Sequence, residues 1–126
     1  SDVTGFGLLG HLREMADASG LTGCVKADAV PILPGVKELV TADHISGGTK
    51  RNLEWVDPVT KWAASVESTP KLILADAQTS GGLLIVLSKN DLERLDHALN
   101  EESVSDWAVI GEFTDRQAGG PSLIVE

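Results

Sequence analysis

The stretch around which this chain is organised reads SDVTGFGLLGHL and runs from Ser1 to Leu12. It joins a carboxylate, a turn rich in glycine and the start of a periodic run of apolar residues. Apolar side chains at positions 8, 9, 12, 15 and 16 fall on one stripe of a helix, and Ser19-Gly20 supplies a C-terminal stop. The pattern predicts a helix over about 6–18.

The polar residues of this stretch lie where a helix begins. Asp2 and Thr4 fall at or just before the N-terminus, where free N–H groups and the positive end of the helix dipole attract anions. Gly5 and Gly7 would let a ligand approach the backbone closely. One interpretation is a bound phosphate whose magnesium is held by Asp2. The alternative is that Asp2 or Thr4 caps the helix and the glycines only form a tight turn into it.

Length and charge set the broad class. At 126 residues the chain fits one domain, residues 1–126, with a core of its own. The 10 basic and 19 acidic residues give a net charge of −9, which disfavours nucleic acids and anionic membrane surfaces as partners. No apolar run is long enough to span a membrane and no secretory leader is visible, so a soluble, cytoplasmic protein is expected. The single cysteine, Cys24, excludes an internal disulfide and is expected to be a small buried side chain.

The remaining pattern predicts an alternation of helices and strands. Five successive apolar residues at 83–87 predict a strand buried on both faces. Asp57-Pro58 resembles a helix cap followed by proline at the first helical position. The other expected strands are 21–27, 107–113 and 122–126, the last two forming a closing hairpin, and the other expected helices are 34–42, 57–66 and 88–100.

Two further patches combine glycine with polar side chains. Gly47–Asn52 offers a hydroxyl, two cations and a carboxamide, which are groups that bind anions; the alternative is a plain solvated loop. Asp76–Gly82 leads into the expected strand at 83–87, whose rigid end would hold a site well. Ser80 lies outside any Gly-x-Ser-x-Gly turn and has no His or acid spaced for a triad, which argues against nucleophilic catalysis.

Together the three patches fit part of a magnesium–nucleotide site, which uses few carboxylates, backbone amides and the substrate's own phosphate oxygens. No Walker-type loop accompanies them, and no second obvious magnesium carboxylate stands beside Asp2. Asp2 occurs at the second position with no preceding element to pack against. We therefore expect the chain to be a fragment of a larger protein.

In order and spacing, the three patches resemble the C-terminal half of the selenophosphate synthetase (selenide, water dikinase) family. This family belongs to the aminoimidazole-ribonucleotide-synthetase-like ATP enzymes. The resemblance covers essentially the whole chain. It departs at Ala77, where proline is usual, a change that alters stiffness more than chemistry.

The resemblance implies an enzyme that makes selenophosphate from selenide, ATP and water and releases AMP and phosphate. It also implies an α+β domain of the aminoimidazole-ribonucleotide-synthetase type, with a four-stranded mixed sheet and flanking helices, partly ferredoxin-like. By position in the motifs, Asp2 would be a Mg²⁺ ligand at the ATP phosphates. The expected neighbours in the same cleft are Thr4, Gly5, Thr49, Asn52, Thr79 and Ser80.

The family's catalytic Cys or selenocysteine, its Lys and its mobile glycine-rich loop belong to the N-terminal half, and no residue here matches them. The resemblance therefore implies that this chain holds no catalytic residue. It would be inactive without its own N-terminal domain, and the full-length enzyme would be a homodimer.

Two alternatives remain. The first is a sister ATP enzyme, such as the purine-pathway cyclo-ligase, a hydrogenase-maturation protein or thiamine-phosphate kinase. The continuation of the first motif through Phe6–His11 argues against these. The second is a non-catalytic module that supports a partner domain by packing.

Overall fold

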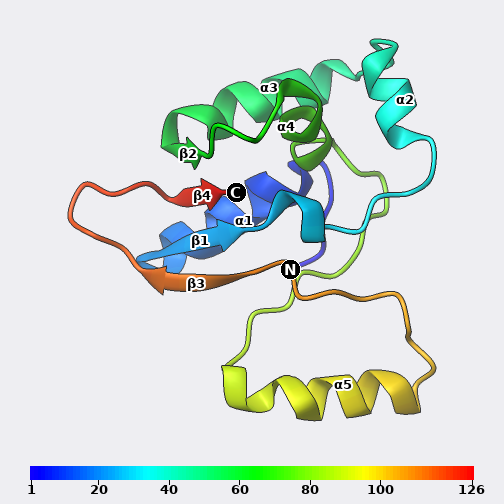
Figure 1. Ribbon diagram of the computed structural model, residues 1–126. Coiled ribbons are helices and arrows are strands. Elements are labelled where there is room, and N and C mark those ends of the chain that lie inside the picture. Colours follow the sequence, from blue (N-terminus) through cyan, green and yellow to red (C-terminus); the bar gives the residue numbers. More distant parts are fainter.

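The computed structural model describes all residues, 1–126, and has α+β architecture. A four-stranded mixed sheet in the order β2-β4-β1-β3 carries helices against it, as Figure 1 shows. No helix combines the length and apolar composition that crossing a bilayer requires. The elements are α1 (Gly7–Ser19), β1 (Leu21–Val25), α2 (Val36–Thr41), α3 (Gly47–Val56), β2 (Thr60–Trp62), α4 (Ser68–Leu74), α5 (Leu92–Glu101), β3 (Gly111–Asp115) and β4 (Leu123–Val125). Short 3₁₀ turns cover Ala27–Ala29, Asp57–Val59 and Lys89–Asp91.

Helix α1 confirms the prediction made from the first stretch. Leu9, Leu12 and Ala16 are buried along one stripe, as the apolar spacing required. The helix ends at Gly20, whose φ of 68° is left-handed and whose N–H reaches the carbonyl groups of Ala16 and Asp17. The core forms where this stripe meets the sheet residues Val25, Leu123 and Val125.

Strand β1 is central in the sheet. It is antiparallel to β3, with Leu21 opposite Asp115, and parallel to β4, with Gly23 opposite Leu123. Strand β4 in turn pairs in parallel with β2. Strands β3 and β4 therefore lie on opposite sides of β1, and the predicted closing hairpin is wrong. The connection after Asp115 crosses the end of β1, which places Leu123 and Val125 in the core.

One further prediction fails because tertiary pairing outweighs local pattern. The predicted helix at 57–66 is a 3₁₀ turn followed by β2, and the β-branched Thr60 pairs with Leu123. The loop alternative for Gly47–Asn52 is also wrong, because this patch forms the first turns of α3. Ser46 caps that helix, its Oγ accepting a hydrogen bond from Thr49 N at 3.1 Å.

The segment 83–87 is not the buried strand that its composition predicted. Leu84 is buried, but Leu83 and residues 85–87 are exposed, and the only pairing is a single antiparallel bridge between Asp2 and Leu83. Five apolar residues in a row cannot reveal whether neighbouring strands cover them.

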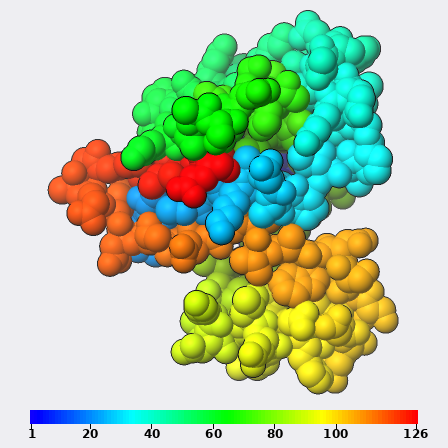
Figure 2. Space-filling view, in the orientation of Figure 1, coloured from blue at the N-terminus to red at the C-terminus, as the bar shows by residue number.

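Helix α5 forms where a helix was predicted, but it contributes no residue to the core. It stands apart from the sheet, joined by two extended connections (Figure 1), and forms a separate yellow lobe in the space-filling view (Figure 2). The strand predicted at 107–113 begins only at Gly111.

Candidate functional site

The first and third polar patches meet in space beside the N-terminal end of α1. Residues 1–4 lie antiparallel to residues 78–84. Val3 N donates to Gly82 O at 2.9 Å, Gly81 N donates to Val3 O at 3.1 Å, and Gln78 N donates to Thr4 O at 3.0 Å. Asp2 is thereby held next to the glycines of the third patch.

The second patch joins them through Asn52 of α3. Its buried Nδ2 donates to Gly5 O at 2.8 Å and to Ala75 O at 3.1 Å. One carboxamide thus fixes the turn before α1 relative to the end of α4. Asn52 has its hydrogen-bond partners inside the protein, which gives it a positioning role.

Thr49, one turn earlier on α3, orients a carboxylate. Its side chain is fully buried, and its Oγ1 donates a hydrogen bond to Asp76 Oδ1. The other oxygen of Asp76 lies 3.3 Å from Gln78 Nε2, which donates to it. Ser46 Oγ lies 2.9 Å from Thr49 Oγ1 and fixes the hydroxyl from the other side. The half-buried Asp76 is therefore held by two donors from different segments.

Sequence reasoning placed Asp76 in a polar patch but did not single it out as a site residue. Its position between an apolar run and a pair of glycines was the available signal. The partner that orients it, Thr49, is 27 residues away in the chain, so only the fold reveals the contact.

The glycines divide into two kinds. A Cβ added at Gly7, whose φ is +68°, would lie 2.7 Å from the backbone of Ala75 and Asp76. A Cβ at Gly81 would lie 2.3 Å from Val3 O. These two glycines permit backbone segments of the protein to approach each other, rather than a ligand. Around Gly5 there is open space, so no neighbouring segment of the chain requires a glycine there.

The start of α1 is not capped by a side chain. Its N-cap residue is Phe6, which makes no side-chain capping hydrogen bond, so the alternative in which Asp2 or Thr4 caps the helix is wrong. Instead, Thr4 Oγ1 lies 3.0 Å from Nε2 of the buried His11, and His11 Nδ1 lies 3.3 Å from Glu14 Oε2.

The groups that remain available for a ligand are exposed. The carboxylate of Asp2 is exposed and makes no hydrogen bond or ion pair within the chain, and Thr79 and Ser80 of the third patch are exposed as well. No group of three or more His, Cys, Asp or Glu side chains is placed to hold a metal ion. This donor set does not fit a metal cage built by the chain alone. It does fit Mg²⁺ as nucleotide sites hold it, by one or two carboxylates with phosphate oxygens and water.

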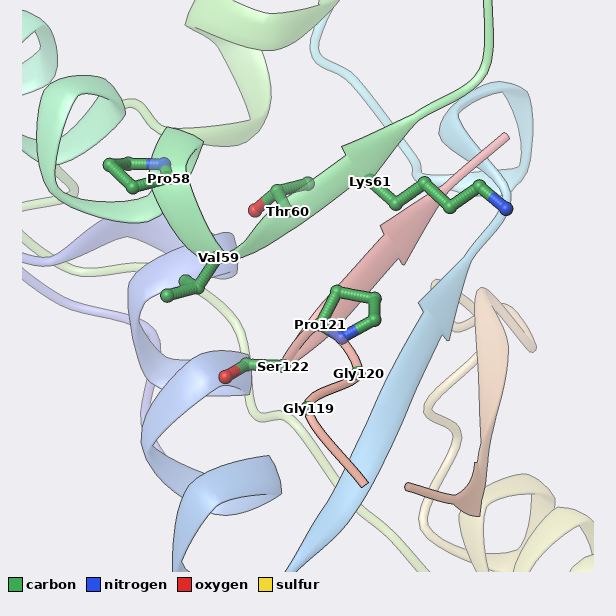
Figure 3. A pocket seen from close by; sticks show the side chains of 8 residues that line it. All are labelled: Pro58, Val59, Thr60, Lys61, Gly119, Gly120, Pro121 and Ser122. Atoms are coloured by element: carbon green, nitrogen blue, oxygen red, sulfur yellow. The ribbon is translucent and has the colours of Figure 1, made fainter. Parts of the chain in front are cut away.

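A hollow of about 420 Å³ lies elsewhere, between Pro58–Lys61 and Gly119–Ser122 (Figure 3). Ser122 Oγ donates to Asp17 Oδ1 at 2.7 Å, which places this hollow beside the last turns of α1. A helix of 13 residues is about 20 Å long, so the hollow lies at the opposite end of α1 from the three patches. None of the predicted site residues lines it.

An α+β domain with polar, glycine-rich segments gathered at the start of α1 fits the class of protein that the motifs indicated. The chain matches the family described as AIR synthase related protein, C-terminal domain, over residues 1–124, and it belongs to that family.

Among its curated relatives are proteins named selenide, water dikinase. The protein from Pseudomonas aeruginosa is 43% identical over 119 residues, covering 94% of this chain and 33% of that protein. The protein from Porphyromonas gingivalis strain ATCC 33277 is 39% identical over 125 residues, covering 98% of this chain and 35% of that protein. The protein from Aliarcobacter butzleri is 36% identical over 116 residues, covering 92% of this chain and 33% of that protein. These matches confirm the resemblance, and the chain spans about a third of the length of these relatives.

Proposed function

We propose that this chain is the C-terminal portion of an enzyme that makes selenophosphate from selenide, ATP and water, with release of AMP and phosphate. In this proposal it supplies part of the Mg-ATP phosphate site. The observation that carries the proposal is the convergence of residues 1–5, 49–52 and 76–82 into one hydrogen-bonded unit beside the start of α1.

Within that unit the residues have different roles. Asp2, an exposed carboxylate without a protein partner, would hold Mg²⁺, which when bound neutralises charge on the phosphates. The exposed hydroxyl groups of Thr79 and Ser80 and the open backbone at Gly5 are available to phosphate oxygens, whereas the hydroxyl of Thr4 is hydrogen-bonded to His11 Nε2.

The two buried residues from α3 act indirectly in this proposal. Thr49 and Asn52 are engaged with Asp76, Gly5 and Ala75, so they position the site instead of contacting the nucleotide. Substituting them would change the placement of the phosphate-binding groups.

The chain needs a partner segment for turnover. Cys24 lies on β1, with its Sγ 3.6 Å from Thr114 Oγ1 in the neighbouring strand, and it is not among the three patches. A chain of net charge −9 repels a polyphosphate unless magnesium and cations from elsewhere offset that charge. We therefore propose that the N-terminal domain of a longer polypeptide completes the site, that the isolated chain is inactive, and that the full-length enzyme is a homodimer.

Isothermal titration of Mg-ATP tests this split site. The chain alone should bind very weakly or not at all, and binding should appear when the N-terminal half is supplied in trans. Tight, magnesium-dependent binding by the isolated chain would contradict the proposal.

A substitution in the full-length enzyme tests the role of Asp2. Asp2→Asn should abolish magnesium-dependent ATP turnover while the circular dichroism spectrum is unchanged. The matched control is Asp115→Asn, because Asp115 is also exposed but lies opposite Leu21, at the other end of α1. An unchanged rate in Asp2→Asn would remove Asp2 from the site.

A further inference from the structure

A short antiparallel ladder pairs residues 1–3 with residues 82–84. Leu84 N donates to Ser1 O at 2.8 Å, and the nitrogen of Ser1 donates to Leu84 O at 2.8 Å. Two residues further along, Val3 N donates to Gly82 O. The ladder therefore has good geometry at Ser1 and has no partner residues beyond it.

The segment opposite Ser1 continues past that point, although it forms no regular strand. Residues 85–87 are Ile85, Val86 and Leu87, with exposed fractions of 43%, 48% and 36%. Their backbone groups make no backbone hydrogen bonds. An exposed apolar segment with free N–H and C=O groups is a template for an additional strand.

We propose that the residues immediately upstream of Ser1 in the longer polypeptide continue the ladder as an antiparallel strand along Ile85–Leu87. This inference rests on the proposed function, in which the chain is the C-terminal portion of a larger enzyme. The occupant follows from the geometry at Ser1. Its nitrogen already donates to Leu84 O, and a peptide N–H in the same place keeps that bond and carries the preceding residue along Ile85. The relatives, about three times as long as this chain, have the length to supply such a segment.

The register of the added strand is fixed by the bonds already present. Antiparallel partners alternate between pairs that exchange two hydrogen bonds and pairs that exchange none. Ser1 and Leu84 form a bonded pair, and Asp2 and Leu83 form a non-bonded one. Val86 therefore forms the next bonded pair, with the second residue before Ser1, whereas Ile85 forms a non-bonded pair.

The extension has a consequence for the site. Asp2 lies in the existing part of the ladder, one residue from the point at which it would be extended. A longer ladder would hold the backbone of Asp2 at a fixed distance from the glycines of the third patch.

Hydrogen exchange resolved to single amides tests this register. The full-length polypeptide is compared with the chain that starts at Ser1. The Leu84 amide should be protected in both, and the Val86 amide should be protected at least about tenfold more in the full-length polypeptide. Equal exchange of Val86 in the two proteins would overturn the proposal. If the Val86 amide instead becomes protected in the shorter chain as the concentration of that chain rises, the proposal is overturned, because a second copy of the chain then pairs with Ile85–Leu87.

Two proline substitutions in the full-length polypeptide form a matched pair. Val86→Pro removes a donor of the extended ladder and should accelerate exchange at Leu84. Ile85→Pro removes an N–H that points away from it and should have a smaller effect. Equal effects would contradict the register. These measurements need no nucleotide, so they are independent of the Mg-ATP titration. Protection of Val86 without Mg-ATP binding in the presence of the N-terminal half would contradict the proposed function alone. Mg-ATP binding without protection of Val86 would contradict only the added strand.

Discussion

Asn52 Nδ2 lies 2.8 Å from the carbonyl oxygen of Gly5 and 3.1 Å from that of Ala75. One buried carboxamide on α3 therefore connects the turn before α1 to the end of α4. Two segments that are 70 residues apart in the chain depend on this side chain for their relative position.

Replacing this side chain should destabilise the fold. Asn52→Ala removes a donor from the buried carbonyl group of Ala75, and an unsatisfied buried group costs about 1–3 kcal/mol, whereas the carbonyl group of the exposed residue Gly5 can bond to water instead. We expect a lower midpoint in urea unfolding with an unchanged slope. The control is Asn100→Ala, because Asn100 is exposed on α5 and bonds only to Asp96. Equal midpoints for the two variants would show that the bonds of Asn52 contribute no more than a surface bond.

A methyl group at Gly7 should be far less tolerated than one at Gly20. Both glycines have a φ of +68°, so alanine at either position carries the cost of a left-handed backbone, about 1–2 kcal/mol. Only at Gly7 would the new Cβ also clash with the backbone of Ala75 and Asp76, whereas Gly20 has open space. Thermal unfolding should show a clearly larger loss for Gly7→Ala. Equal losses would mean that the backbone at Ala75 moves away at no cost.

Core leucines and leucines on α5 should differ strongly in their contribution to stability. Leu9 on α1 is fully buried, so Leu9→Ala should cost about 2–5 kcal/mol. Leu95 lies on α5, which adds no residue to the core, so Leu95→Ala should cost less than about 1 kcal/mol. Urea unfolding of the chain measures both. A large loss for Leu95→Ala would show that α5 packs against the sheet in solution.

Asp17 should make the stability depend on acid pH. Burial raises the pKa of Asp17, but hydrogen bonds from Ser122 and Arg116, the charge of Arg116 and a hydrogen bond from Arg13 together outweigh it. The pKa therefore lies below its ordinary value of 3.8. The unfolded chain then binds the proton more readily than the folded one. The stabilisation that the Asp17 carboxylate provides is fully present above pH 3.8, the ordinary pKa that applies to the unfolded chain. It is lost as the pH falls through the lower pKa of the folded chain.

The Tm of the chain and of Asp17→Asn, followed from neutral to acid pH, tests this linkage. The variant should be less stable near neutral pH, and the gap should close as the pH falls below 3.8. The effect should be well below 1 kcal/mol, because the carboxylate is 41% exposed and solvent screens the ion pair. A gap that stays constant with pH would exclude the linkage.

Local pattern was sufficient for the elements whose periodicity and end signals agree. The stripe from Leu8 to Ala16 and the stop at Gly20 predicted α1 to within about a residue at each end, because a helix is built from contacts three and four residues apart. Pattern was insufficient for β2. Its three residues lie in a stretch whose spacing also suits a helix, and pairing with β4 decided the outcome.

The sequence by itself determined the start of α1 and the three polar patches, because periodicity and turn residues are local properties. It indicated the class of the fold through the family resemblance that the order of its motifs carries. The tertiary structure alone decided which patch residues face inward and which remain open. Thr49 and Asn52 are buried with internal partners, whereas Asp2 and Ser80 are exposed. It also left the apolar segment 83–87 exposed, since burial depends on which distant strands arrive beside a residue and not on the residue's own polarity.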